Sequence, residues 1–299
     1  MASIAADIET PLQAFLRQFR ASRMALLGAM VLLIAIAAAL LAPWIAPQNP
    51  YDLAQIDILD ARLPPGAVSP EHGTTYLLGT DEQGRDMLSA ILYGMRISVF
   101  VGITSTVVAL AIGLVLGLLA GYAGGRLDAL IMRVADIQLS FPSILIALIL
   151  LAVLGSGLGK IVLALIAVQW AYYARTARSA AIVERRKEYI EAAVGLGLPP
   201  SRIVFRHLLP NCLPPLIVVA ALQVASAISL EATLSFLGLG LPVTEPSLGL
   251  LIANGFNYLL SGKYWISMFP GAALLVLIVA INLVADQLRD VLNPRLQSL

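Results

Sequence analysis

The chain has 299 residues, of which 59% are hydrophobic and only 12% are charged, against about 25% charged residues in soluble domains. This composition excludes an ordinary soluble protein and indicates a membrane protein. The net charge of +1 implies no bulk attraction to nucleic acid, and the single cysteine, Cys212, excludes an internal disulfide framework.

Six apolar segments are long enough to cross a bilayer core of about 30 Å. They lie at about residues 24–46, 97–122, 134–154, 161–181, 213–236 and 266–288. We therefore predict an all-α, polytopic membrane protein with about six transmembrane helices. Its predicted parts are an N-terminal tail (1–23), a first transmembrane helix (24–46), an outer loop with a surface helix (47–95), and a core of five transmembrane helices (96–299) that includes an inner loop at 184–211.

The basic residues predict the orientation of these spans. Six spans place both termini on one side of the membrane. If that side is the inner one, the inner segments hold 14 of the 19 lysines and arginines, and the outer segments hold five. The positive-inside rule then predicts that both termini and the 184–211 loop are cytoplasmic.

The outer loop, residues 47–95, is the longest stretch outside the predicted spans, and it is rich in proline and acidic residues. Thr80 or Asp81 is a suitable N-cap for a helix that lies along the outer surface and continues into the next span. We predict that the loop is an external platform. The alternative is an extracellular turn that binds no partner.

The second span carries Gly113, Gly117 and Gly121 at four-residue spacing. A row of small residues lets two helices approach each other closely in lipid. The spacing therefore predicts a helix–helix contact and gives no information on a substrate.

Glu231 is the one acid near the middle of an apolar run. A charge at the centre of a span costs roughly 2.5–3.5 kcal/mol on insertion scales, so such residues usually face a cavity or lie near a span end. Glu231 is therefore a candidate gate, path or subunit-contact residue. A structural role, with the carboxylate reaching toward the membrane surface, is the alternative.

The inner loop predicts a helix–turn–helix on the membrane surface. The segment Glu184–Leu196 carries good helix formers, and Gly197 supplies a helix end. Ser201 is the expected N-cap of a short helix, Arg202–Leu208, and Asn211 is the expected cap of the next apolar helix.

Four separated motifs resemble one family, the ABC-importer permeases. The inner loop resembles the EAA loop of these permeases in its spacing. It has Glu191-Ala192-Ala193, then Gly197 after three residues, His207 after nine more, and Leu209-Pro210 after one more. His207 replaces the isoleucine of the general pattern, and histidine followed by Leu-Pro-Asn is common in the peptide/nickel branch. The other three motifs are Leu78–Asp81 with Gly84-Arg85-Asp86 and Ser89, Glu231 before Ser-Phe-Leu-Gly-Leu-Gly, and Asp286–Arg295. Relatives usually carry arginine at the position of Ala90.

The chain is therefore identified as a member of the peptide/nickel type of ABC-importer inner-membrane permeases, the DppC/OppC group, over nearly all residues after Arg17. The resemblance implies a type I importer permease in a bacterial inner membrane. It implies a second related permease, two cytoplasmic ATP-binding subunits that carry ATP and Mg, a periplasmic substrate-binding protein and membrane lipid as partners, and no nucleic acid or cofactor on this chain. The residues implied to couple to the ATPases are Glu191, Ala192, Ala193, Gly197, His207, Leu209 and Pro210. The loop residues implied to face the binding protein are Gly79, Thr80, Asp81, Gly84, Arg85 and Asp86.

The sequence carries no catalytic set. It has no HExxH or GxSxG motif and no His/Cys cluster for a metal, and the turn at Gly155–Lys160 fails the phosphate-loop pattern. We therefore expect a non-enzymatic transport subunit. A secondary transporter without an ATPase is the alternative. Di- and oligopeptides, nickel chelates and glutathione are all served by relatives with these motifs, so the substrate stays open.

Overall fold

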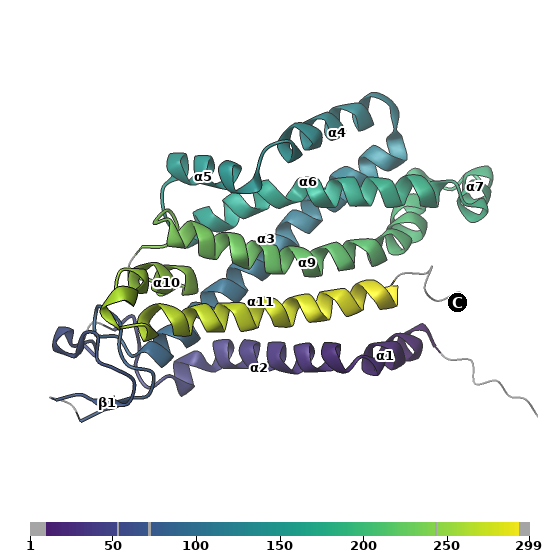
Figure 1. Ribbon diagram of the computed structural model, residues 1–299. Coiled ribbons are helices and arrows are strands. Elements are labelled where there is room, and N and C mark those ends of the chain that lie inside the picture. The colour runs from purple at the N-terminus through teal and green to yellow at the C-terminus, as the bar shows by residue number, and fades with distance from the viewer. Residues whose placement is uncertain (1–9, 53, 71–72, 243, 293–299) are drawn as a thin grey trace, which may run out of the picture.

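The computed structural model describes residues 10–52, 54–70, 73–242 and 244–292 and is an elongated bundle of helices (Figure 1). The long helices are α2 (Arg23–Ile45), α3 (Met87–Ala123), α6 (Leu158–Arg185), α9 (Leu209–Phe236) and α11 (Trp265–Leu292). The shorter helices are α1 (Pro11–Ala21), α4 (Gly125–Leu139), α5 (Ser143–Leu154), α7 (Glu188–Gly195), α8 (Pro200–Arg202) and α10 (Leu248–Phe256). Three further short segments are η1 (Ile58–Asp60), η2 (Ile203–Leu208, a π-helix) and η3 (Leu259–Ser261). The predicted all-α class is confirmed.

The number of membrane spans differs from the predicted six. Among the described residues, four helical stretches are long and apolar enough to cross a membrane: α2, α3, the continuous stretch Pro200–Phe236, and α11. A bent pair of helices, α4 and α5, gives a fifth if it is one span. α6 has 28 residues, about 42 Å of helix, but Lys160, Gln169 and Arg175 lower its hydropathy.

The predicted continuous span at 134–154 is wrong. α4 and α5 are separated by Ser140–Pro142 and bent by 90°. Pro142 disfavours helical backbone at the residue before it, which explains the break. α5 alone has 12 residues, about 18 Å, and is too short to cross the bilayer core. Just before the break, the Gln138 side chain donates hydrogen bonds to the Ala167 and Val168 carbonyls of α6, at 2.5 and 3.0 Å.

The outer loop also differs from its prediction. Between Pro47 and Asp86, the described residues form η1 and a hairpin of two short antiparallel strands, β1 (Ala67–Val68) and β2 (Thr75–Tyr76), and no long surface helix. α3 begins only at Met87. Its N-cap is Asp86, which accepts a 2.8 Å hydrogen bond from the Ser89 N–H. The predicted caps Thr80 and Asp81 are therefore wrong.

The three glycines of α3 face α6, as predicted. A Cβ atom on Gly113 would lie 2.5 Å from the Trp170 carbonyl oxygen, and one on Gly117 would lie 2.4 Å from the Ala174 oxygen. Contacts this short leave no room for a methyl group. α3 and α6 therefore pack backbone to backbone along the glycine row.

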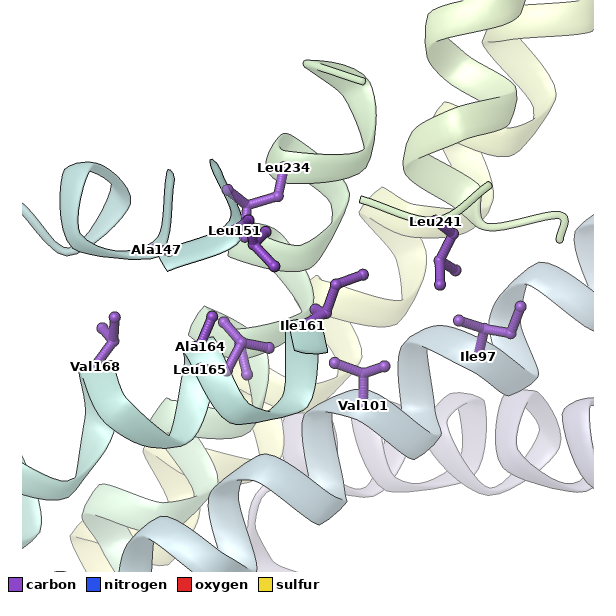
Figure 2. Close-up of a cluster of buried hydrophobic side chains, with 11 residues drawn as sticks. Ile97, Val101, Ala147, Leu151, Ile161, Ala164, Leu165, Val168, Leu234 and Leu241 are labelled. Carbon is purple, nitrogen blue, oxygen red and sulfur yellow. The ribbon is translucent and has the colours of Figure 1, made fainter. Parts of the chain in front are cut away.

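The largest apolar cluster joins four helices beside this contact (Figure 2). Ile97 and Val101 come from α3, and Leu165 comes from α6. Leu151 of α5 and Leu234 of α9 close the cluster. The cluster places the short helix α5 against the core despite the break that precedes it.

The two predicted functional loops lie at opposite ends of the bundle. Figure 1 shows α1, α7 and the C-terminal end of α11 at one end, and the β1–β2 hairpin and α10 at the other. One end therefore carries the EAA-like loop, and we call it the α7 end. The other carries the loop 47–86, and we call it the hairpin end.

We expect Gly117→Ala to lower the thermal stability of the purified protein, because the added methyl group forces α3 away from α6. Overpacking of a close contact costs about 1–3 kcal/mol. The control is Gly271→Ala in α11, where a Cβ atom meets nothing within 4 Å. Equal melting temperatures for the two variants in detergent would contradict the close packing.

Candidate functional site

α7 projects beyond the ends of α6 and α9 at one end of the bundle (Figure 1). α6 ends at Arg185, and α7 runs from Glu188 to Gly195. Gly197 follows with φ of +71°, a backbone conformation that favours glycine and prevents the helix from continuing. The loop is therefore a short helix presented at the end of the molecule.

The structure corrects three local predictions in this loop. The predicted helix 184–196 is divided, because α6 contains Glu184 and a new helix begins at Glu188. Pro199 stands at the next N-cap position instead of Ser201. Asn211 caps no helix, because the helical stretch from Pro200 continues through a π-helix, η2, into α9 without interruption.

The seven EAA-like residues divide between α7, the turn after it and the junction of η2 with α9. Glu191 and Ala192 are exposed on α7, whereas Ala193 is buried against Ile190 and Ile203. Gly197 is exposed in the turn. The remaining three lie where η2 joins α9, with His207 and Leu209 half-buried and Pro210 exposed.

An apolar tip accompanies these residues, and sequence reasoning missed it. Val194, Leu196 and Phe205 are 57%, 80% and 68% exposed. The sequence does not distinguish these three residues, because apolar residues occur almost throughout the chain. Val194 lies in α7, Leu196 follows α7 directly and Phe205 lies in η2, so large apolar side chains are exposed on both sides of the turn at Gly197. Exposed apolar side chains on a projecting loop suit a surface that binds another protein.

A hydrogen-bond network beside α7 was also missed. The Tyr189 hydroxyl donates to the Glu184 carboxylate at the end of α6 and accepts from Asn211 Nδ2 at 3.0 Å. Asn211 Nδ2 also donates to the His207 carbonyl at 2.7 Å. Burial raises the pKa of Tyr189 to about 12, and Glu184 adds to the shift, so the hydroxyl keeps its proton at neutral pH.

A cavity of about 1100 Å³ opens beside this network. It lies between α1, α6, α9 and α11. Its polar lining includes both acidic and basic side chains, among them Arg175, Glu184, Lys187, Asn211 and Arg289. The network therefore forms part of the wall of a mixed-charge cavity at the α7 end of the bundle.

At the hairpin end, the structure brings the six predicted loop residues together, but inside the loop. Asp81 and Arg85 are each about 1% exposed and form a 2.7 Å ion pair. Thr80 Oγ1 donates to the Asp60 carbonyl at 2.5 Å, and Asp86 is also buried. These side chains hold the loop in shape and are not surface charges.

The two glycines of this set have the same structural role. Gly79 and Gly84 have φ of +79° and +83°. A Cβ atom on them would lie 2.5 Å from the Leu63 oxygen and 1.9 Å from the Asp57 oxygen. The exposed surface of the loop is instead apolar at Ile58, Leu59 and Leu77.

Glu231 is fully buried in α9. The carboxylate accepts hydrogen bonds from Ser98 of α3 at 3.1 Å and from Ser235 at 2.8 Å. Ser247, the N-cap of α10, also bonds to it. Glu231 therefore joins three helices near the hairpin end of the bundle.

Comparison with known proteins matches two separate parts of the chain. Residues 113–298 match the family described as "Binding-protein-dependent transport system inner membrane component". Residues 10–65 match the family described as "N-terminal TM domain of oligopeptide transport permease C".

Individual relatives extend the similarity along the chain. The chain is 39% identical to the di/tripeptide transport system permease protein DppC of Pseudomonas aeruginosa, over 97% of this chain and 94% of that protein. It is 41% identical to the dipeptide permease DppC of Escherichia coli, over 96% of this chain and 94% of that protein. The fold is similar to a chain of the inward-facing MetNI methionine ABC transporter, with a TM-score of 0.56 and 22% identity over 69% of this chain and 97% of that one.

We expect Asp81→Asn to loosen the outer loop, because the carboxylate charge that faces the buried Arg85 is lost. Removing one partner of a buried pair costs about 3–5 kcal/mol. Limited proteolysis of the detergent-solubilised protein should cleave the 47–86 segment faster. The control is Asp52→Asn, because the asparagine side-chain oxygen can still accept the hydrogen bond from the Ala54 N–H. Equal cleavage rates in both variants would contradict the structural role of the pair.

Proposed function

The chain belongs to the family of binding-protein-dependent transport-system inner-membrane components, and from this we propose that it forms, with a second related permease, the transmembrane path of an importer for di- and oligopeptides. Its role as an ABC-importer permease follows from the family and fold. The observation that carries the substrate class is the 39% identity to a di/tripeptide permease over 97% of this chain. Nickel chelates and glutathione are the related solutes that a binding assay would have to exclude. The secondary-transporter alternative has no support among these relatives.

Two ATP-binding subunits, which carry the ATP and Mg, are proposed to bind at the α7 end. The exposed apolar tip of α7 supports this, together with the position of α7 beyond the bundle. Glu191, Ala192, Ala193 and Gly197 then lie in the contact. The ATPase contact would be connected to α9 through His207, Leu209 and Pro210. Closure of the ATPases would move α7 and change the packing of the bundle as a rigid-body motion.

A periplasmic binding protein is proposed to dock at the hairpin end. Gly79, Thr80, Asp81, Gly84, Arg85 and Asp86 shape the platform from inside. Ile58, Leu59 and Leu77 provide apolar contact surface on it. Asp81 and Asp86, which the resemblance implies to face the binding protein, are buried and are not proposed to touch it.

Glu231 is proposed as a gate residue of the path. Its carboxylate connects α3 to α9 through Ser98 and reaches α10 through Ser247. An outward opening of the bundle would separate these helices. The buried hydrogen bonds of Glu231 would then favour the closed arrangement, since a buried carboxylate without partners is costly.

The protein is a multi-pass membrane protein, and we propose that both termini are cytoplasmic. The excess of basic residues in the inner segments supports this orientation. α6 is proposed as the sixth span, because its 28 residues exceed the bilayer core in length and it packs against α3.

The coupling assignment predicts that Gly197→Pro abolishes the stimulation of ATP hydrolysis by the binding protein. Proline cannot adopt the native φ of +71°, so the turn after α7 must change its conformation. Glu191→Arg, which reverses an exposed charge on α7, should have the same effect. Both variants should still insert and assemble, because the loop is at the surface. The assay is ATPase activity of the complete transporter in proteoliposomes.

The control for this experiment is Gly262→Pro. It makes the same substitution at a glycine with φ of +78° that follows η3, at the hairpin end of the bundle. Stimulation at the wild-type level in Gly197→Pro and Glu191→Arg would refute the coupling role of α7.

The orientation predicts opposite labelling of two exposed positions. A cysteine at Leu59 should react with an impermeant thiol reagent applied to the periplasmic side of cells. One at Ser201 should react only after the cytoplasmic side is opened. The native Cys212 is buried and provides the background control. The reverse pattern would overturn both the topology and the assignment of the ATPase contact.

A further inference from the structure

α7 is held to the bundle by two kinds of contact, and only one of them is directional. Ile190 and Ala193 of α7 pack with Ile203 in a small apolar cluster. Apolar burial resists separation of these surfaces but is non-directional, so it does little to prevent sliding or rotation. Hydrogen bonds weaken steeply when their geometry changes. The orientation of α7 therefore depends on its hydrogen bonds to neighbouring helices.

The Tyr189 hydroxyl supplies these bonds, and it connects three helical elements. Through Glu184 it contacts the end of α6, and through Asn211 it contacts α9. The Glu184 carboxylate is held by a second partner, because its Oε2 lies 2.8 Å from Lys187 Nζ. Glu184 is only 6% exposed, so its end of the network is shielded from solvent, whereas Tyr189 is 40% exposed and its bond to Asn211 lies at the surface.

The part of α9 that the network reaches is deficient in ordinary helical bonds. The Leu209 N–H donates to the Val204 carbonyl, five residues earlier, as in a π-helix. Pro210, Pro214 and Pro215 have no N–H to donate. The Asn211 side chain donates to a carbonyl of this same stretch, at His207. A helix with missing bonds is easily deformed, so a side chain that adds one there can control its shape.

We propose that Tyr189 is a positioning residue of the coupling apparatus. Its hydroxyl ties α7 to the end of α6 and to the π-helical start of α9, so that a displacement of α7 is transmitted to both helices. This role rests on the proposed coupling function and adds to it the connection between the ATPase contact and the transmembrane helices.

Tyr189→Phe tests the proposal, because it removes the hydroxyl and keeps the ring. In the complete transporter in proteoliposomes, the ratio of binding-protein-stimulated to basal ATP hydrolysis should fall about fivefold, which corresponds to about 1 kcal/mol, the net value of a typical hydrogen bond. Asn211→Leu should cause a similar decrease. The double variant should be no worse than either single one, because members of one network are not additive.

The matched control is Tyr172→Phe on α6, where the hydroxyl makes no hydrogen bond to any residue that the structure describes. Its ratio should equal that of the wild type. Spin labels at Val194 and Leu213, in a Cys212→Ala background, report the position of α7 relative to α9 without reference to activity. Their distance distribution should broaden in Tyr189→Phe and stay unchanged in Tyr172→Phe.

An unchanged ATPase ratio in Tyr189→Phe overturns the proposal, whatever the spin labels show. So does an unchanged distance distribution, or a double variant whose loss is the product of the two single losses. Gly197→Pro in the same assay distinguishes failure of the positioning role of Tyr189 from failure of the coupling function of α7. If it abolishes stimulation and Tyr189→Phe does not reduce it, only the positioning role fails. If neither variant has an effect, the coupling function of α7 fails as well.

Discussion

The close contact between α3 and α6 is the constraint on which the rest of the bundle depends. In lipid there is little hydrophobic force between helices, so association depends on close packing and on hydrogen bonds. Gly113, Gly117 and Gly121 let the two backbones meet, with no space for even one methyl group at the interface. The apolar cluster of Figure 2 then packs beside this contact and brings α5 and α9 to it.

The same two helices position both functional ends. α3 begins at Met87 and is capped by Asp86, directly after the buried ion pair of Asp81 and Arg85, so the outer loop is anchored to the start of a helix in the core. At the other end, α6 leads into α7 after only two residues. Arg185 donates to the Tyr122 carbonyl near the end of α3, which holds the two helix ends together where α7 begins.

α9 receives a polar connection near each of its ends. Near the hairpin end, Glu231 is bonded to serines of α3, α9 and α10. Near α7, Asn211 is bonded to Tyr189 and to the π-helical turn. Polar groups in an apolar bundle form hydrogen bonds with one another, and these partners define preferred arrangements of the helices. In the proposed function, α9 is therefore the helix that links the ATPase contact to the candidate gate.

The sequence by itself determined the class of the protein, the row of glycines in a helix interface, and the location of the EAA-like loop. These follow from local properties: the length of apolar runs, the spacing of small residues, and a motif that fixes residue types over about two dozen positions. The same apolar runs predict six spans, whereas the described residues contain four helical stretches long and apolar enough to cross a membrane and one bent pair, because α6 carries polar residues and the chain bends by 90° between α4 and α5.

Only the tertiary structure decided which polar residues are buried and what they contact. Asp81 and Asp86 stand in a polar loop like surface residues, and Glu231 stands in an apolar run. Some of their partners come from distant parts of the chain, such as Gln48 for the Asp86 N–H and Ser98 for Glu231. Tyr189 and Asn211 are likewise 22 residues apart. No local sequence pattern encodes a contact between such distant residues, because the contact depends on how α6, α7 and α9 pack. The sequence therefore located the EAA-like loop, and the fold alone revealed how that loop is connected to α6 and α9.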